Sequence, residues 1–507
     1  MKLSTEQLEK LIKQEPRNVL ALCDLSDRHF KLGNNGRSIW LLHSALDIMP
    51  ESLKILLKMA TRFYRTEQYN EACRYYELAL EAGSEKSGTL GALGAIKWRI
   101  GETTEARRHL ETAYENGNRQ PQTLFCLAAI SHLDANYDKA LALMQEAVQK
   151  KPKNSYYGYA LETLSVRHEN IKNPPKEYQE RRIALHINQN FHYNIMKPIF
   201  DELSKAYHVV MTDNPYWLRE FDPDIIIVAD SQARTLKQVM PRSKYVFTCH
   251  GFSSKNHVFK AASHCDYICL SSPYQQKRYE EEGGFRPEQL WNVGYAQMDM
   301  LFHKQPTPLS EPIDPSQKTI LYAPTYNKEL SSAPMLGADL VNKIRGPKGQ
   351  ENLIIKPHPQ IYLRSPEWMK WFREAASHHE NVFFIEDPAA NVMPYLKNAD
   401  ILVSDASSVI FEYLAMDRPI ILLTNPEREK STHYDPNGLE WRWRDVGEEL
   451  SDVSALTDAV QKALASPDER QEQRGIRAEM LFGNLRNGET GKHIKGEIEA
   501  LYDGNIF

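Results

Sequence analysis

The sequence contains little cysteine. Its six cysteines include no Cys-x-x-Cys pair and show no regular spacing of the kind that a disulfide framework or a zinc site requires. They stand at positions 23, 73, 126, 249, 265 and 269. This scarcity argues against a small disulfide-stabilised fold and favours a reducing compartment, the cytoplasm.

An excess of positive charge is also missing. Lys and Arg together number 62 against 67 Asp and Glu, which gives a formal net charge of −5. No bulk positive field is available to hold a polyanion such as DNA, so we do not expect nucleic acid as the main partner. Hydrophobic residues make up 41% and charged residues 25% of the chain, which is ordinary for a folded globular protein.

Long apolar runs are absent as well. Aliphatic stretches such as Ile225–Val228 are far shorter than the roughly 20 residues of a membrane-spanning helix. The opening residues MKLSTEQLEKLIKQEP lack the apolar core of a secretion signal. We therefore expect a soluble protein with at most a peripheral contact at the inner face of the plasma membrane.

The chain has 507 residues, enough for about three domains, and its first third repeats with a period of 34 residues. Three columns of small residues keep this step: Ser26, Ala60, Gly94 and Ala128; Ser38, Ala72, Ala106 and Ala140; Ala45, Ala79, Ala113 and Ala147. Two columns of mostly turn-forming residues keep it too: Pro16, Pro50, Ser84, Asn118 and Pro152; Gly33, Glu67, Gly101 and Ala135. Antiparallel helices approach closely only where small side chains face each other, so the columns predict four units of paired helices.

The period and the small columns resemble the tetratricopeptide repeat over residues 1–171. The segment 155–171, rich in Tyr and Leu, is predicted to form the helix that caps the solenoid. Such solenoids usually present a concave surface to a peptide or a partner protein. We therefore expect a protein partner or self-association through the repeats, with packing against a neighbouring domain as the alternative. No residue of the repeats indicates catalysis.

After a linker at residues 172–180, short apolar runs alternate with helical stretches, which is typical of an α/β fold. A segment with prolines at 306, 308, 312 and 315 separates two series of runs. The runs are residues 183–187, 208–212, 224–229, 245–249, 267–270 and 290–293, then 319–323, 353–356, 382–385, 401–403 and 419–423. Continuous runs of this kind predict strands buried on both faces. We expect two doubly wound, Rossmann-like domains at residues 181–305 and 316–507, the GT-B architecture of nucleotide-sugar enzymes.

Ligands of such sheets bind beyond the carboxyl ends of the strands, where the sequence places several candidate residues. The run 245–249 leads into His250 and Gly251. A histidine at a strand end followed by glycine can reach a cleft as a general base, because imidazole titrates near neutral pH. A histidine that only stabilises its loop is the alternative, and the spacing does not decide between the two.

Two further strand ends carry polar residues. The run 319–323 leads into Pro324 and Thr325, a turn that offers a hydroxyl and backbone N–H groups to an anion. The run 353–356 ends in Lys356-Pro357-His358-Pro359, in which two prolines stiffen the loop around one imidazole. A stiffened side chain suits a preorganised site.

The strongest local signal is a buried run followed by Ser404-Asp405-Ala406-Ser407-Ser408 and an apolar-periodic helix. Serines at a helix N-terminus lie where free N–H groups and the helix dipole favour phosphate. Ordinary N-capping by Ser or Asp is the alternative, and both roles can coexist. Glu412, one turn into the helix, could face a ribose or remain a solvated carboxylate.

These residues resemble the CDP-glycerol glycerophosphotransferases of teichoic-acid and capsule synthesis. The matching elements span about residues 240–500, and the α/β part before them is similar only in fold. The elements are His250-Gly251, Leu270-Ser271-Ser272-Pro273, Val293-Gly294-Tyr295 with Asp299, Leu321-Tyr322-Ala323-Pro324-Thr325, Lys356-Pro357-His358-Pro359, Ser404-Asp405-Ala406-Ser407-Ser408, Asp417-Arg418-Pro419 and Asn487-Gly488-Glu489-Thr490.

The chain departs from the family pattern in three stretches. Cys249 replaces the usual Trp before His-Gly, and Phe252-Ser253-Ser254-Lys255 follows where the family has Pro-Leu-Lys. Tyr-Pro-Arg-Asn-Asp becomes Tyr295-Ala296-Gln297-Met298-Asp299, and Asp-Tyr-Ser-Ser becomes Asp405-Ala406-Ser407-Ser408. The donor therefore stays open among glycerol phosphate, ribitol phosphate and a sugar.

The resemblance implies transfer of glycerol phosphate, or a similar polyol phosphate, from a CDP-activated donor to a hydroxyl of a surface-glycan, teichoic-acid or capsule acceptor, releasing CMP. His250 would be the base on the acceptor hydroxyl, and His358 would stabilise or protonate the donor phosphates. The donor-binding residues would be Thr325, Lys356, Asp405, Ser407, Ser408 and Glu412, with Asp405 orienting its turn, and the acceptor-side residues Gly251, Ser253 and Lys255. No metal or other cofactor is expected, because N–H groups, hydroxyls and an imidazolium can stabilise the leaving diphosphate.

Two alternatives stay open at this point. One is a GT-B glycosyltransferase with a nucleotide-sugar donor, or a UDP-sugar 2-epimerase, that uses the same phosphate cradle. The other is a non-catalytic assembly factor that acts through its repeats, although the presence of both His250 and His358 argues against it.

Overall fold

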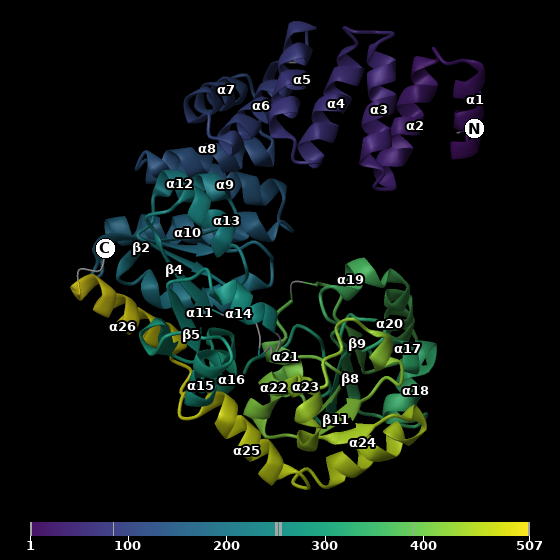
Figure 1. The fold of residues 1–507 in the computed structure, drawn as a ribbon, viewed down its shortest axis with the longest axis vertical. Helices are drawn as coiled ribbons and strands as arrows, with labels where there is room; N and C mark the ends of the chain where they lie inside the picture. The colour runs from purple at the N-terminus through teal and green to yellow at the C-terminus, as the bar shows by residue number, and fades with distance from the viewer. Residues whose placement is uncertain (1–2, 85, 249–251, 253–255, 389, 505–507) are drawn as a thin grey trace. The chain divides into compact units, whose positions relative to one another are not determined.

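The computed structural model describes residues 3–84, 86–248, 252, 256–388 and 390–504, which form two compact units. The repeat unit contains Met1–Pro174 and Asn214–Phe221, and the α/β unit contains Pro175–Asp213 and Asp222–Phe507. The chain therefore passes between the units three times. Figure 1 labels many of the elements of both.

The repeat unit is an array of antiparallel helices, which confirms the predicted solenoid. Its helices are α1 (Thr5–Gln14), α2 (Val19–Lys31), α3 (Asn35–Leu46), α4 (Leu53–Arg65), α5 (Tyr69–Glu81), α6 (Lys86–Ile100), α7 (Thr103–Glu115), α8 (Pro121–Leu133), α9 (Tyr137–Lys150) and α10 (Ser155–Lys172). Every member of the three small columns is buried. The four pairs from α2/α3 to α8/α9 therefore meet where the sequence places small side chains, and α10 follows as the capping helix.

The turns inside the pairs share one backbone conformation. Gly33, Glu67, Gly101 and Ala135 all have positive φ, between 57° and 90°. Glycine adopts this left-handed conformation at little cost, whereas Glu and Ala adopt it rarely. The period of 34 residues thus fixes the turn geometry even where the glycine is replaced.

A short helix from outside the repeats belongs to the same unit. Helix α12 (Pro215–Phe221) lies in sequence between strands β2 and β3 of the α/β unit but packs against α6 and α8. The domain predicted at residues 181–305 included this segment, which the structure assigns to the repeat unit.

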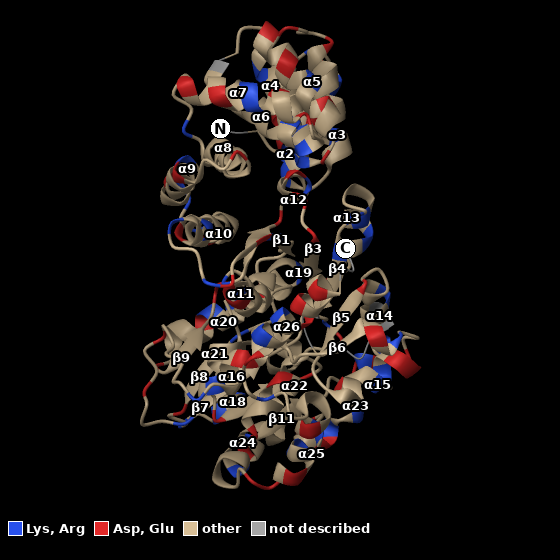
Figure 2. Cartoon of the chain, turned by 90° about the vertical axis from the view of Figure 1, so that its left-hand side faces the viewer, with Lys and Arg blue, Asp and Glu red and all other residues tan. Residues whose placement is uncertain are grey.

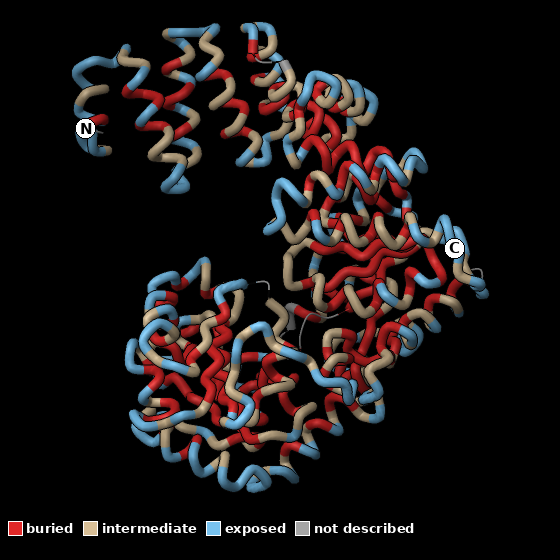
Figure 3. Tube along the Cα trace, turned by 180° about the vertical axis from the view of Figure 1, so that it is seen from behind, coloured by how far each residue is buried: buried red, intermediate tan, exposed pale blue. Residues whose placement is uncertain are grey.

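The α/β unit contains two parallel, six-stranded sheets, which confirms the doubly wound architecture. The strands of the first sheet are β1 (Gln179–His186), β2 (Tyr207–Thr212), β3 (Ile225–Val228), β4 (Lys244–Thr248), β5 (Tyr267–Leu270) and β6 (Leu290–Asn292). Those of the second are β7 (Thr319–Ala323), β8 (Asn352–Ile355), β9 (Val382–Phe384), β10 (Ile401–Ser404), β11 (Ile420–Leu423) and β12 (Glu448–Leu450). Most strand positions are buried, and Figure 3 shows the buried residues in the interior of the trace. Charged residues of both signs lie mainly on the helices and loops (Figure 2).

The strand orders place a switch point in each sheet. The first sheet has the order β2-β1-β3-β4-β5-β6, and the second has the order β12-β11-β10-β7-β8-β9. Connections from β1 and β3 therefore leave in opposite directions, as do those from β7 and β10. A crevice opens at such a point beyond the carboxyl ends of the strands. Strand β12 was not predicted, because its sequence Glu-Glu-Leu at the sheet edge contains no aliphatic run.

Helices surround both sheets. They are α11 (His192–Leu203), α13 (Ala233–Val239), α14 (Asn256–Ala262), α15 (Pro273–Glu281), α16 (Asp299–Phe302), α17 (Ala333–Leu336), α18 (Leu340–Arg345), α19 (Ile361–Arg364), α20 (Pro366–His378), α21 (Met393–Asn398), α22 (Val409–Tyr413), α23 (Leu439–Arg442), α24 (Leu456–Ala465), α25 (Gln471–Phe482) and α26 (Thr490–Asp503). The last two return to the first half: α25 packs on α15, and α26 packs on α11. The end of the predicted range 316–507 thus covers the first sheet.

Several motif residues interlock the two halves. The hydroxyls of Ser271 and Ser272 donate to the carbonyl oxygens of Leu481 and Met480, each at 2.7 Å. Asp299 accepts hydrogen bonds from the Thr490 backbone N–H at 3.0 Å and the Thr490 hydroxyl at 2.6 Å. These residues attach the crossing segment, which contains α25 and α26, to the first half of the α/β unit. They do not line the cavity described below.

Two glycines of α6 provide a matched test of the close helix approach. A Cβ at Gly94 would lie 2.7 Å from Leu110 Cγ and 3.1 Å from the Ala106 carbonyl oxygen, whereas a Cβ at Gly88 would meet nothing within 4 Å. Alanine favours a helix over glycine by about 1 kcal/mol, so Gly88→Ala should stabilise the repeats. Gly94→Ala should instead destabilise them by roughly 1–3 kcal/mol, because α6 and α7 must move apart. Thermal unfolding followed by circular dichroism measures both, and equal stabilisation would contradict the contact.

Candidate functional site

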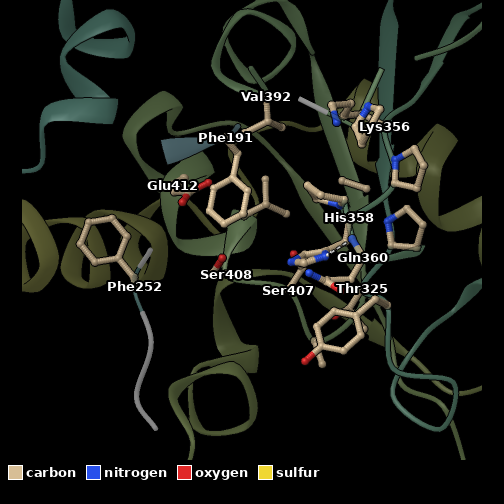
Figure 4. Close-up of a pocket in the computed structure, with 18 of the residues that line it drawn as sticks. Phe191, Phe252, Thr325, Lys356, His358, Gln360, Val392, Ser407, Ser408 and Glu412 are labelled. Carbon is tan, nitrogen blue, oxygen red and sulfur yellow. Dashed lines mark hydrogen bonds between the residues drawn. The ribbon is translucent and has the colours of Figure 1, made fainter. Parts of the chain in front are cut away.

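A cavity of about 400 Å³ opens in the α/β unit beyond the carboxyl ends of the strands. One wall follows β7, β8 and β10 of the second sheet. The other follows β1 and β4 of the first. Figure 4 shows Thr325, His358 and Ser407 close together on one side, with Phe252 on the other. Five of the six donor-binding residues predicted from the sequence line this cavity, Thr325, Lys356, Ser407, Ser408 and Glu412, and so does the predicted catalytic residue His358.

Asp405 does not line the cavity but lies fully buried beneath it. Its carboxylate accepts hydrogen bonds from the backbone N–H groups of Thr325 at 2.9 Å, Ser332 at 2.7 Å and Ala406 at 2.8 Å, and from the Ser332 hydroxyl at 2.7 Å. Burial raises the pKa of Asp405, and these donors oppose the shift. The structure thus places Asp405 as the residue that joins two turns, which is the orienting part of its predicted role, and away from direct contact with a ligand in the cavity.

The buried guanidinium of Arg444 supports the same turn. It donates to the Asp405 carbonyl oxygen, to the Thr424 hydroxyl at 2.6 Å and to the Glu449 carboxylate at 3.1 Å. Arg444 was not predicted, because it lies far along the chain in a segment without a recognisable motif. Its contacts fix the backbone from which Ser407 and Ser408 reach the cavity.

The serines do not act as ordinary caps of α22. Ser408 stands at the N-cap position, yet its side chain makes no capping hydrogen bond. Helix α22 has only five residues before it tightens into a 3₁₀ turn, so the turn itself, more than a helix dipole, presents the hydroxyls. Ser407 and Ser408 both line the cavity.

The loop after β8 presents an imidazole in a defined orientation. The Gln360 backbone N–H donates to His358 Nδ1 at 3.1 Å, and the Tyr326 ring lies 4.8 Å from the imidazole, centroid to centroid. Because Nδ1 accepts this bond, the neutral ring carries its proton on Nε2. His358 is therefore arranged as a hydrogen-bond donor through Nε2.

Lys356 is a buried cation at the same wall. Burial lowers the pKa of Lys356 to about 8, against the opposing charge of Asp387. An ammonium group in such a place gains from a bound anion, which replaces the hydration that burial removes.

Glu412 also lines the cavity and is buried. Burial raises the pKa of Glu412 from its ordinary 4.5 to about 7. The solvated carboxylate considered from the sequence is therefore not what the structure shows. Glu440, at the start of α23, is a second acidic residue in the lining.

The opposite wall was largely missed from the sequence. It is formed by Gln189, Phe191, Asn194, Phe252, Val258 and Gln297. The first three follow β1, and the amide-rich stretch at residues 188–194 was an available signal that no motif covered. The predicted residues His250, Gly251, Ser253 and Lys255 lie outside the described residues, between β4 and α14.

Within the described part of the chain, no group of three or more His, Cys, Asp or Glu residues could hold a metal ion. A search of the same residues finds no helix with the length and apolarity needed to span a membrane.

Comparison with known proteins gives consistent matches. The family model described as CDP-Glycerol:Poly(glycerophosphate) glycerophosphotransferase matches residues 163–499. The teichoic acid glycerol-phosphate primase of Bacillus subtilis (strain 168) is 26% identical over 174 residues, 32% of this chain and 41% of that protein. The protein of the same name from Bacillus spizizenii (strain ATCC 23059 / NRRL B-14472 / W23) is 24% identical over 298 residues, 55% of this chain and 70% of that protein.

The match to the first relative thus spans less than half of its length. Among solved structures, the wall teichoic acid polymerase TagF is similar with 16% identity and a TM-score of 0.49, over 74% of this chain and 98% of that one.

The pKa of Glu412 makes stability depend on pH. The Glu412 carboxyl stays protonated up to about pH 7 in the folded state but only up to about pH 4.5 in the unfolded chain. Its contribution to the free energy of unfolding is therefore fully present below pH 4.5 and is lost as the pH rises to 7. Glu412→Gln removes the ionisation, so it should gain stability relative to the wild type between pH 5 and pH 8, by up to about 3 kcal/mol. Urea unfolding at both pH values measures the change. Glu367→Gln, at an exposed position of α20, is the control, and a pH-independent difference for Glu412→Gln would contradict the assignment.

Proposed function

The chain belongs to the CDP-glycerol:poly(glycerophosphate) glycerophosphotransferase family, and from this premise we propose that it transfers glycerol phosphate, or a similar polyol phosphate, from a CDP-activated donor to a hydroxyl of a surface-glycan, teichoic-acid or capsule acceptor. The observation that carries the proposal is the cavity in which Thr325, Lys356 and His358 meet the serines of the turn after β10. These are the hydroxyl, ammonium and imidazole groups that bind phosphate oxygens.

The donor diphosphate lies against the wall formed by the second sheet. His358 donates a hydrogen bond from Nε2 to a phosphate oxygen, and Lys356 supplies a positive charge. Proton transfer from a neutral imidazole would leave an anion, so the geometry supports stabilisation of the diphosphate by His358 more than its protonation. Glu412, across the cavity, accepts a hydrogen bond from a ribose hydroxyl.

The reaction is a displacement at the phosphorus that bears the polyol. An acceptor hydroxyl oxygen attacks this phosphorus, the new P–O bond forms, and the bond to the bridging diphosphate oxygen breaks. CMP leaves with the bonding electron pair, and His250 takes the proton of the acceptor hydroxyl. The charge that develops on CMP is met by Lys356, His358 and the hydroxyl groups, so a metal is not required.

The acceptor enters along the wall formed by the first sheet. Gln189, Asn194 and Gln297 supply amide groups there, and Phe191 and Phe252 supply aromatic faces. Amide groups pair with the hydroxyls of a polyol or a sugar. His250 follows β4 in the sequence, and its role as the base for the acceptor hydroxyl rests on the family resemblance.

Turnover of the full-length protein tests the function directly. With CDP-glycerol and a short poly(glycerol phosphate) oligomer, in the presence of EDTA, mass spectrometry should detect CMP and an acceptor lengthened by one unit or more. His358→Ala should lower the rate roughly 10²-fold or more and His250→Ala roughly 10²–10⁴-fold. His378→Ala, an exposed imidazole at the end of α20, is the control. Release of UDP from UDP-sugars instead, or unchanged turnover in folded His358→Ala, would overturn the proposal.

Lys356 should make donor binding depend on pH. A bound diphosphate favours the ammonium form, whose pKa in the free protein is about 8. Affinity for CDP-glycerol should therefore fall about five-fold between pH 8 and pH 9, as one proton must be taken up on binding. Titration calorimetry without acceptor measures this dependence. Lys356→Met should bind weakly at both pH values, Lys370→Met, at an exposed position, should behave as the wild type, and a pH-independent affinity of the wild type would contradict the role.

A further inference from the structure

Helix α12 has its own start signal but is too short to persist alone. The Asn214 side-chain oxygen accepts hydrogen bonds from the backbone N–H groups of Tyr216 at 2.9 Å and Trp217 at 3.0 Å, and Pro215 occupies the first turn. Isolated helices of seven residues are not stable in water. The order of α12 therefore depends on the surface that receives it, α6 and α8 of the repeat unit (Figure 1).

Aromatic side chains make this contact. Trp217 is fully buried and meets the rings of Phe125 at 6.0 Å and His132 at 5.6 Å, both edge to face, while Phe221 lies 6.1 Å from His132. Trp217 and Phe221 are four residues apart and so lie on one face of α12. Burial lowers the pKa of His132 to about 3, so its ring is neutral and acts as an aromatic contact.

The receiving surface belongs to an aromatic column with the period of the repeats. Phe30, Tyr64, Trp98 and His132 are spaced by 34 residues, one in each of the helices α2, α4, α6 and α8. Trp98 and His132, on the two helices that α12 contacts, are 1% and 2% exposed. Phe30 and Tyr64 are only partly buried. The two column residues on the helices that α12 contacts are therefore more deeply buried than the other two.

Polar contacts border the aromatic ones. Gly101, in the left-handed turn after α6, leaves room for the Arg219 guanidinium, since a Cβ there would lie 2.4 Å from Arg219 Nη1. The Thr103 hydroxyl donates to the Glu220 carboxylate at 3.3 Å. An apolar centre with a polar border is the pattern of a binding site for an amphipathic helix.

The first repeats have a buried core that does not involve α12. Residues of α1 to α6 form a continuous buried cluster that includes Ala45, Ala60, Ala72 and Ala79 of the small columns and no residue of α12. The Trp217 indole N–H, in addition, has no hydrogen-bond acceptor within the described part of the chain, which weakens the contact. The cluster of α1 to α6 thus forms without α12, which comes from the connection between β2 and β3.

We propose that the surface of α6 and α8 is a receptor site for a short helix with aromatic residues four positions apart, and that α12 is its bound ligand, supplied by the chain itself. The repeats thereby bind the connection between β2 and β3. A partner protein with a helix of the same pattern can enter this site only by displacing α12. The proposal does not depend on the chemistry of the α/β unit.

Hydrogen exchange of the full chain tests the site. In the double variant Trp217→Ala and Phe221→Ala, amides of α6 and α8 should exchange roughly ten-fold faster, while those of α2 and α4 keep their rates. A peptide with the sequence of residues 213–222, Asp-Asn-Pro-Tyr-Trp-Leu-Arg-Glu-Phe-Asp, should restore protection in the variant and leave the wild type unchanged. The same peptide with Ala in place of Trp and Phe is the control.

Two results would overturn the proposal. Loss of protection in α2 and α4 together with α6 and α8 would make α12 part of the repeat fold, and a folded variant that the peptide fails to protect would show that no receptor site exists. Should the double variant not fold, Asn214→Ala removes the two capping hydrogen bonds and no aromatic contact. Protection of α8 should then fall several-fold and return with the peptide, and failure to return counts against the proposal equally.

Discussion

The Asp405 carboxylate holds together the turns on which the candidate site depends. Burying a charge costs free energy unless donors surround it, and here three backbone N–H groups and one hydroxyl do so. They come from the turns after β7 and β10, which are neighbours only because the strand order of the second sheet reverses between them. The positions of Thr325 and Ser407 thus depend on this strand pairing, and the Asp405 carboxylate joins the turns that the pairing brings together.

The predictable parts of the molecule follow from periodicity and burial. The columns spaced by 34 residues predicted the helix pairs because close packing permits only small side chains there, and aliphatic runs predicted the inner strands because these are buried on both faces. Strand β12 was not predicted, because an edge strand needs no aliphatic run. The cavity wall with Gln189 and Gln297 was not predicted, because amide groups follow no spacing rule. The packing of α12 was not predicted, because the surface that it contacts lies in another part of the chain.

Motif resemblance did not separate chemistry from architecture. Lys356 and His358 line the cavity, whereas Ser271, Asp299 and Thr490 tie the crossing segment of the second half to the first. Asp417 belongs to the second class, since it accepts a hydrogen bond from the buried Arg474 of α25 at 3.1 Å. All of these residues carry the family resemblance, although only Lys356 and His358 were predicted to act at the site. A motif can hold both kinds, because a buried polar group needs a hydrogen-bond partner just as a ligand-binding group needs its ligand.

The return of α26 to α11 also sets an order of events during synthesis. Gly491 lies against Pro198, where a Cβ would come within 2.5 Å of the carbonyl oxygen, so the two helices fit closely. Strands β1 to β6 leave the ribosome long before α26 exists, and α11 stays uncovered meanwhile. Each repeat, by contrast, contacts mainly its neighbours and can fold as it emerges. When α12 follows, α6 and α8 are already complete, whereas the first half of the α/β unit remains exposed to chaperones and to misassembly until translation has passed residue 503.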